Sequence, residues 1–259
     1  YFFLIFAEEW NLLILQFMNG KITGVSLGPG EPELITVKAL KTLQAADVIF
    51  CPATLRGKEE RESKAARILE ALGINTAKIR FFLVPMSTDR TAVNKVYDEI
   101  CKEMAECAGA GQKVSLTAEG DACFYSSAHY IFEKLQRLGI SVKMIAGVPA
   151  FIAAGASVGL HIVKQRERML VIPGDVSAEE LESALNRGYT VVIMKVPLGE
   201  EIVRSYMAHH PEEHYFYFEQ VGTAAEYITS VYAEILKHPF TYFSILVIQA
   251  AKRHKNITK

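Results

Sequence analysis

Two hydrophobic patterns alternate along the first half of the chain. Short apolar runs rich in valine and isoleucine are followed by longer stretches in which apolar residues recur every three or four positions. The first pattern is typical of buried strands, and the second is typical of helices that pack one face on a core. We expect strands at 22–27, 47–51, 79–84, 113–117 and 142–146, and helices at 36–45, 63–72, 92–108 and 126–138. Because strand alternates with helix, a mostly parallel sheet covered on both faces is predicted.

The alternation begins again after Gly147. Small residues fill 150–159, which predicts a helix that packs closely on a neighbour, and the SAEE stretch at 177–180 is a capping box that opens another helix. Further strands are expected at 169–172, 190–196, 215–221 and 243–250. The predicted fold class is α/β, with two α/β domains that contain mainly parallel mixed sheets. The predicted divisions are an N-terminal extension at 1–17, an N-terminal α/β domain at 18–145 and a C-terminal α/β domain at 146–259.

The apolar extension at 1–17 does not fit a membrane span or a secretory signal. It has no basic residues, and Glu8, Glu9 and Asn11 interrupt the apolar run well before the roughly 20 residues that a span needs. It is interpreted either as sequence upstream of the folded body, which Met18 would begin, or as an amphipathic helix that packs on the body or on a second subunit. No membrane partner is expected.

Composition narrows the class of protein. Half of the 259 residues are apolar, 22% are charged and the net charge is −1, which is typical of a soluble globular chain with no general attraction to nucleic acid. None of the four cysteines forms a C-x-x-C pair, so a cytoplasmic location is expected, with each cysteine acting as a small buried apolar residue. The histidines of HHPEEH at 209–214 lack further ligands at suitable spacing, and no metal site is predicted.

A loop with the sequence GPGEP follows the first expected strand. It matches neither the dinucleotide fingerprint nor the P-loop. Pro29 has no N–H to offer a phosphate, and Glu31 adds a negative charge where the phosphate would lie. The loop is therefore predicted to accept an uncharged or cationic ligand, and an ordinary tight turn between strand and helix is the alternative.

A second motif, EGDACFYSS at 119–127, follows the expected strand at 113–117. Gly120 allows a ligand to approach the backbone, and Phe124 and Tyr125 offer ring faces ahead of a helix that Ser126 or Ser127 caps. Ligands of such sheets bind beyond the carboxyl ends of the strands, where both motifs fall. Carboxylates in both motifs suit a cation.

GPGEPELIT at 28–36 followed by EGDACFYSS resembles the tetrapyrrole methylases of cobalamin and sirohaem biosynthesis. The resemblance runs from residue 21 to 249 and is also carried by ADVIFCP at 46–52, AGVPAF at 146–151, VVIMK at 191–195 and YFSILVI at 242–248. It implies the tetrapyrrole methylase fold, with S-adenosylmethionine (SAM) bound in a cleft between the two domains and leaving as S-adenosylhomocysteine. It also implies a homodimer.

Within this family, FYSS, MK and YFS are most similar to the C20-methyltransferases. The implied function is methylation of C20 of precorrin-2 or cobalt-factor II in cobalamin biosynthesis, a branch of porphyrin biosynthesis. The implied partner is therefore a tetrapyrrole substrate. The alternatives are a methylase for another tetrapyrrole carbon and an inactive SAM-binding module. A dinucleotide oxidoreductase is disfavoured because the third glycine of the fingerprint is missing, and near-zero charge disfavours an RNA substrate.

The resemblance also implies which residues form the site. The implied SAM-binding residues are Pro29, Glu119, Gly120, Asp121, Phe124, Tyr125, Pro149, Ala150, Met194, Gly222, Thr223 and Ala224. Three positions depart from the family pattern: Glu31 replaces an aspartate, Ala122 replaces a proline, and Pro149 replaces a hydroxylated residue.

A base is needed to remove the C20 proton after methyl transfer, and two residues are candidates. Tyr125 is the first candidate and Asp121 is the second. The alternatives are that Tyr125 only stacks and that Asp121 only caps backbone amides. Basic residues in the loop at 56–64, and the group formed by Lys164, Arg166 and Arg168, are candidates to pair with substrate carboxylates; solvated charged loops are the alternative.

Overall fold

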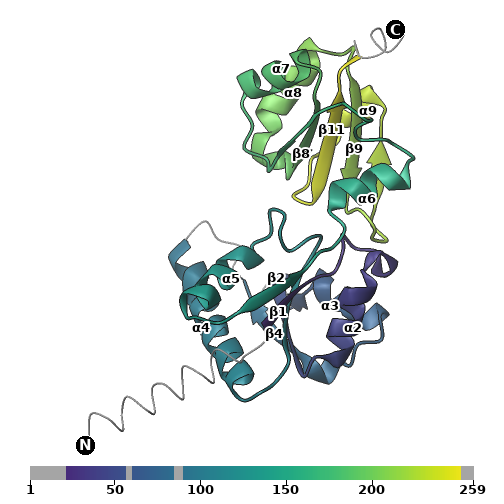
Figure 1. Ribbon diagram of the computed structural model, residues 1–259. Helices are drawn as coiled ribbons and strands as arrows, with labels where there is room; N and C mark the ends of the chain where they lie inside the picture. The colour runs from purple at the N-terminus through teal and green to yellow at the C-terminus, as the bar shows by residue number, and fades with distance from the viewer. Residues whose placement is uncertain (1–21, 57–59, 85–89, 252–259) are drawn as a thin grey trace, which may run out of the picture. The chain divides into compact units, whose positions relative to one another are not determined.

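The structure of the protein is a computed structural model that describes residues 22–56, 60–84 and 90–251 (Figure 1). The chain divides into two compact units, one ending at Pro149 and the other beginning at Ala150. The extension predicted at 1–17 lies outside the described residues. Within those residues, no helix has the length and apolar character needed to cross a bilayer.

The first unit is built on a six-stranded sheet. Its strands are β1 (Ile22–Ser26), β2 (Val48–Arg56), β3 (Glu60–Glu62), β4 (Ile79–Leu83), β5 (Val114–Ala118) and β6 (Val142–Ile145). Its helices are α2 (Val37–Ala45), α3 (Lys64–Ala71), α4 (Arg90–Gly109) and α5 (Ala128–Arg137), with 3-10 turns η1 (Pro32–Leu34) and η2 (Thr76–Lys78). β4, β2, β5, β1 and β6 pair in parallel, as predicted, and lie in that order in the sheet. β3 folds back antiparallel on β2.

Helices cover both faces of this sheet. Figure 1 shows α4 and α5 on one side and α2 and α3 on the other, and each pair packs into its own cluster of buried residues with one face of the strands. Hydroxyl caps begin two of these helices: Thr36 Oγ1 accepts the Ala39 N–H at 3.2 Å, and Ser63 Oγ accepts the Ala66 N–H at 3.1 Å.

The end of β2 differs from the prediction. The expected strand stops at residue 51, whereas β2 continues to Arg56 and pairs with β3. The continuation is held by backbone pairing to β3, whose sequence ERE is charged and has no apolar signal for a sequence pattern to detect.

The second unit contains a five-stranded mixed sheet in the order β10-β9-β11-β8-β7. Its strands are β7 (Met169–Ile172), β8 (Thr190–Met194), β9 (His214–Glu219), β10 (Tyr227–Thr229) and β11 (Ser244–Gln249). Its helices are α6 (Ala150–Ser157), α7 (Ala178–Asn186), α8 (Glu200–His209) and α9 (Tyr232–Ile235), with the 3-10 turn η3 (Val196–Gly199). The predicted class of two α/β domains is confirmed.

The second sheet is less parallel than the pattern predicts. β7 and β8 pair in parallel, but the β8–β11, β11–β9 and β9–β10 pairs are antiparallel. The link between β9 and β10 is a short turn, and a short link between neighbouring strands permits only antiparallel pairing. The predicted capping box is present, because Ser177 Oγ accepts the Glu180 N–H at 3.1 Å. α7, α8 and α9 share one core with the strands.

Candidate functional site

Two glycine loops meet beyond the carboxyl ends of β1 and β5. The Gly28 N–H donates to Gly120 O at 3.1 Å, and the Gly120 N–H donates to Gly28 O at 2.7 Å. Both glycines have positive φ, +80° and +67°, a conformation that other residues adopt only under strain. The two motifs singled out in the sequence are therefore joined directly, and half-buried Pro29 lies beside the junction.

A buried serine fixes these loops to the sheet. Ser26, fully buried at the end of β1, donates its hydroxyl to Ile145 O at 2.7 Å and accepts the Ala122 N–H at 2.8 Å. One side chain thus connects β1, β6 and the loop after β5. Sequence reasoning missed Ser26, although a serine directly before Leu27, at the end of an expected buried strand, is a signal for such a role.

Asp121 organises the third loop, which follows β6. Its Oδ1 accepts the Cys123 N–H at 2.8 Å, and its Oδ2 accepts the Gly147 N–H at 2.6 Å. A Cβ on Gly147 would clash with Ser26 and lie 2.6 Å from Gly120 O, so only glycine fits there. Both oxygens of the Asp121 carboxylate are engaged by backbone amides.

Glu119 lies between β5 and the beginning of α3. Burial raises the pKa of its carboxyl group, while the Lys64 ammonium and a hydrogen bond from the Ala65 backbone N–H act in the opposite direction. This carboxylate sits in the same loop as Gly120 and supplies negative charge close to the paired glycines.

Phe124 and Tyr125 present aromatic rings at the loop after β5. Their ring centroids lie 4.7 Å apart in an edge-to-face arrangement, and 48% of Tyr125 is exposed. Tyr125 has φ +48°, a left-handed conformation that is costly for an aromatic residue and often marks a functional position. The predicted capping of α5 is made by Ser126, whose Oγ accepts the Ala128 N–H at 3.3 Å, and not by the Ser127 side chain.

Cys123, in the same loop, corrects one expectation. Cys51, Cys101 and Cys107 are buried, as predicted, whereas Cys123 is exposed because the loop carries it away from the core. Its Sγ lies 3.8 Å from Met144 Sδ. Partial desolvation of the thiol and the neighbouring Asp121 carboxylate raise the pKa of Cys123, which disfavours its reactive thiolate form.

Five of the implied site residues belong to the second unit, beginning with Ala150. Ala150 is the first residue of α6, directly after Pro149, and both are half-buried. Met194 ends β8 and pairs with Ile245 of β11. The next residue, Lys195, has φ +55° and donates its backbone N–H to Ser244 O at 2.9 Å.

The implied adenine-binding segment 222–224 forms a compact turn between β9 and β10. The Gly222 N–H donates to Glu226 Oε2 at 2.6 Å, and the Thr223 N–H donates to Gln220 O at 3.1 Å. Ala224 is exposed at the turn. Two of these three amides are therefore hydrogen-bonded inside the turn, and a ligand that used the Gly222 amide would have to displace Glu226.

The other candidate residues, the basic groups and the histidines at 209–214, do not form a second site in the described residues. Lys164, Arg166 and Arg168 are exposed, and Arg168 donates to the Tyr189 hydroxyl at 3.1 Å. Arg56 and Lys58 fall where side chains are not described. His209 Nδ1 lies 2.8 Å from Ser205 O, and His210 Nδ1 lies 3.6 Å from Glu212 Oε1. The described ranges contain no cluster of three metal-ligating side chains.

The donor set of the first unit suits a cationic ligand such as the sulfonium of SAM. The position that a Cβ of Gly120 would occupy is open, which leaves room beside the backbone. A carboxylate at Glu119 and the ring faces of Phe124 and Tyr125 attract positive charge. No cradle of successive N–H groups is available for a phosphate at Pro29.

Comparison with known proteins places this geometry in a family. The chain is 31% identical over 181 residues to a cobalt-precorrin-2 C(20)-methyltransferase of Salmonella typhimurium, covering 69% of the chain and 74% of that protein. It is 27% identical over 241 residues to a precorrin-2 C(20)-methyltransferase of a Sinorhizobium species, covering 90% and 96%. It is also 29% identical over 156 residues to a cobalt-precorrin-4 C(11)-methyltransferase of Methanocaldococcus jannaschii, covering 60% and 52%.

Solved structures share the fold. A cobalt precorrin-4 methyltransferase superposes with a TM-score of 0.68 at 18% identity, covering 90% of this chain and 96% of the other. A uroporphyrin-III C-methyltransferase of Thermus thermophilus, in complex with S-adenosylhomocysteine, has a TM-score of 0.61 at 17% identity, with 91% and 94% covered. The model of the tetrapyrrole (corrin/porphyrin) methylases matches residues 21–235. Because this match spans both units, the chain belongs to the tetrapyrrole methylase family.

Proposed function

We propose that the protein is a SAM-dependent methyltransferase that methylates C20 of precorrin-2 or cobalt-factor II in cobalamin biosynthesis. The observation that carries the choice of carbon is coverage: the two relatives named for C20 align with 69% and 90% of the chain. Two relatives named for C11 align with 60% and 65%. The specific alternative is therefore methylation of another tetrapyrrole carbon, C11 first.

Three loops of the first unit would hold SAM. The Gly28–Gly120 pair fixes the position of the backbone, and the Glu119 carboxylate and the rings of Phe124 and Tyr125 favour a positive sulfonium. In the second unit, Met194 and the 222–224 turn are the residues proposed to contact adenine. Pro149, the last residue of the first unit, and Ala150, the first residue of α6, are proposed to line the site as well. Pro149 offers no hydroxyl, so fewer polar contacts are expected there.

Bound SAM supplies a methyl group that is already activated by a positively charged sulfur. The protein's main task is to hold the acceptor carbon in line with that methyl group, and such alignment supplies several kcal/mol of rate enhancement. The C20–methyl bond forms as the sulfur–methyl bond breaks, and the sulfur keeps the electron pair. C20 then loses its proton to restore conjugation, which requires a base.

Tyr125 is proposed to accept this proton or to orient a water that does. Its exposed ring and strained backbone suit a residue held out toward a ligand. Asp121 is the weaker candidate, because both of its carboxylate oxygens already accept backbone N–H groups. We assign Asp121 a positioning role toward the Gly147 loop, which is the structural alternative considered from the sequence.

The test is an anaerobic incubation of the purified protein with methyl-labelled SAM. Precorrin-2, cobalt-factor II and cobalt-precorrin-4 are offered separately, and mass spectrometry with carbon NMR locates the label. A single labelled methyl at C20 is the expected result, and the preferred substrate identifies the cobalamin route. Label at C11 would replace the proposal with its alternative, and SAM binding without transfer would indicate an inactive binding module.

A further inference from the structure

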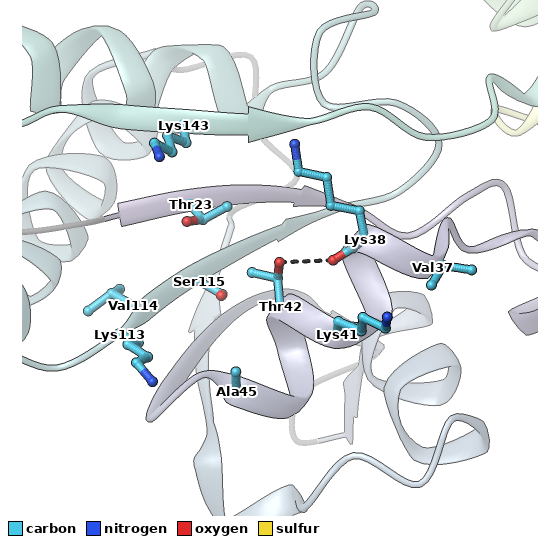
Figure 2. Close-up of a pocket in the computed structure, with 10 residues that line it drawn as sticks. All are labelled: Thr23, Val37, Lys38, Lys41, Thr42, Ala45, Lys113, Val114, Ser115 and Lys143. Atoms are coloured by element: carbon cyan, nitrogen blue, oxygen red, sulfur yellow. Dashed lines mark hydrogen bonds between the residues drawn. The ribbon is translucent and has the colours of Figure 1, made fainter.

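A pocket of about 710 Å³ opens at the opposite end of the first sheet from the methyltransferase loops. Four lysines line it, two from α2 and two from the starts of strands β5 and β6, together with the hydroxyl residues Thr23 and Ser115 (Figure 2). Thr23 precedes Gly28 by five residues along β1, which corresponds to roughly 16 Å in a strand. The pocket is therefore separate from the paired glycine loops.

The floor of the pocket is a polar row across three strands. Thr23 of β1 pairs in register with Ser115 of β5 on one side and with Lys143 of β6 on the other. Residues two positions further along a strand face the same way, and there Val25 and Ile145 belong to the apolar core under α2. On β1 and β6 this face of the sheet thus changes from apolar to polar where the pocket begins, whereas β5 has the buried Thr117 beside Val25.

The wall of the pocket carries positive charge. Lys38 and Lys41 are three positions apart on α2, so they lie on the same side of the helix. Lys113 directly precedes β5, and Lys143 lies in β6. All four are exposed, and none forms an ion pair with a carboxylate of the described residues. The nearby Asp47 carboxylate accepts the Lys113 backbone N–H at 2.7 Å.

Like charges gathered around one cavity repel each other, and a bound anion relieves that repulsion. The volume falls within the range of small-molecule sites, about 300–1,000 Å³. The pocket is open to solvent, so a small ligand can reach the lysine side chains, and the whole chain, at net charge −1, has no general attraction to an extended nucleic-acid strand.

We propose that this lysine pocket binds a small, multiply charged anion through its phosphate or carboxylate groups. Ammonium groups bind either kind of oxyanion as point charges, and the Thr23 and Ser115 hydroxyls add hydrogen-bonding capacity at the floor. The site is additional to the proposed methyl-transfer site and does not depend on it.

Isothermal titration calorimetry of the full chain without SAM tests this proposal. Inorganic tripolyphosphate and benzenehexacarboxylate are titrated separately at constant ionic strength. We expect one saturable site, and we expect K38Q/K143Q to weaken binding by about tenfold or more. The matched control is K95Q/K102Q, which removes the same charge from exposed positions on α4 and should change affinity less than about twofold.

The probe that binds more tightly identifies phosphate or carboxylate as the recognised group, and either result supports the pocket. The variant K38R/K143R keeps the charge and should retain binding, and thermal unfolding without ligand checks that each variant is folded. Equal weakening by the two glutamine doubles would mean that only overall charge matters, and this would overturn the proposal. Dissociation constants above about 1 mM for both probes would also overturn it.

Discussion

Tyr125 combines the backbone conformation of a glycine with an aromatic side chain. Its φ of +48° costs of order 1 kcal/mol for a residue with a Cβ, and the flanking Asp121–Cys123 turn and the start of α5 keep it in place. Nearly half of the residue is exposed, so core packing does not account for the strain. We propose that the strain serves to present the ring and its hydroxyl to a ligand.

Replacing Tyr125 with phenylalanine separates the hydroxyl from the ring. If the hydroxyl takes or relays the C20 proton, Tyr125→Phe lowers kcat by about 100-fold and leaves SAM affinity within about twofold. Single-turnover methyl transfer and calorimetric SAM binding measure the two effects. An unchanged kcat would leave the hydroxyl no role in proton removal, and a loss confined to SAM affinity would assign the residue to binding.

Glu119 gives the protein a pH-dependent contribution to stability. Burial raises the pKa of Glu119 in the folded state, so the folded state binds this proton more tightly than the unfolded state. The free energy of unfolding therefore falls as pH rises from the unfolded pKa through the folded pKa. Glu119→Gln removes this decline, and its stability relative to wild type should increase from pH 4 to pH 7 in urea titrations.

The same substitution also removes the carboxylate proposed to face the sulfonium, so Glu119→Gln should weaken SAM binding several-fold. Glu106→Gln, at an exposed position on α4, is the matched control for loss of one negative charge. If the free energy of unfolding has the same pH dependence in both variants, the burial of Glu119 does not govern that dependence.

At the scale of elements, the site is a set of three loops held in one hydrogen-bonded unit. Gly147 is its tightest point, because an added Cβ would meet the Gly120 carbonyl, which cannot rotate away. Gly147→Ala should break the Asp121–Gly147 hydrogen bond, destabilise the first unit by about 1–3 kcal/mol and lower SAM affinity more than tenfold. Denaturant unfolding and calorimetry measure both.

Gly109→Ala is the control for this substitution. Gly109 is the last residue of α4, and no atom lies within contact of the position that its Cβ would take. Alanine there should leave stability unchanged or slightly raised, with normal SAM affinity. Equal losses in the two variants would mean that the effect does not arise from crowding between the loops.

The elements and the glycine motifs were readable from the sequence because their signals are local. The apolar runs of β1, β5 and β7 and the capping residue Ser177 fall where they were expected. β3 and β10 were missed because each has three residues and depends on pairing with a neighbour. Antiparallel pairing of β9, β10 and β11 likewise depends on connections that hydrophobic pattern does not encode.

The support of the site was not readable for a related reason. Ser26 bonds to residues 96 and 119 positions away, and Asp121 bonds to Gly147, 26 positions away. No local sequence pattern predicts these pairings. The left-handed conformation of Tyr125 likewise arises only in the folded chain. The same holds for the hydrogen bond that the Gly222 N–H donates to the Glu226 carboxylate.

At the scale of the whole molecule, each compact unit has its own apolar core. The second unit's cluster is drawn from residues beyond Ala150 and includes Leu246 of β11, which is fully buried. The clusters of the first unit include Leu116 of β5, which is also buried. Units with separate cores can open separately, and their local stabilities can then be measured one at a time.

Matched cavity variants test this independence. Leu246→Ala and Leu116→Ala each remove a buried leucine side chain, and each should cost about 2–5 kcal/mol. Hydrogen exchange followed by mass spectrometry should show faster exchange at 150–251 for Leu246→Ala and at 22–149 for Leu116→Ala, with the other unit unchanged. Each variant serves as the control for the other. If either substitution accelerates exchange equally in both units, the chain unfolds as one cooperative body, and substitutions at the 222–224 turn would have to be interpreted together with those at the glycine loops.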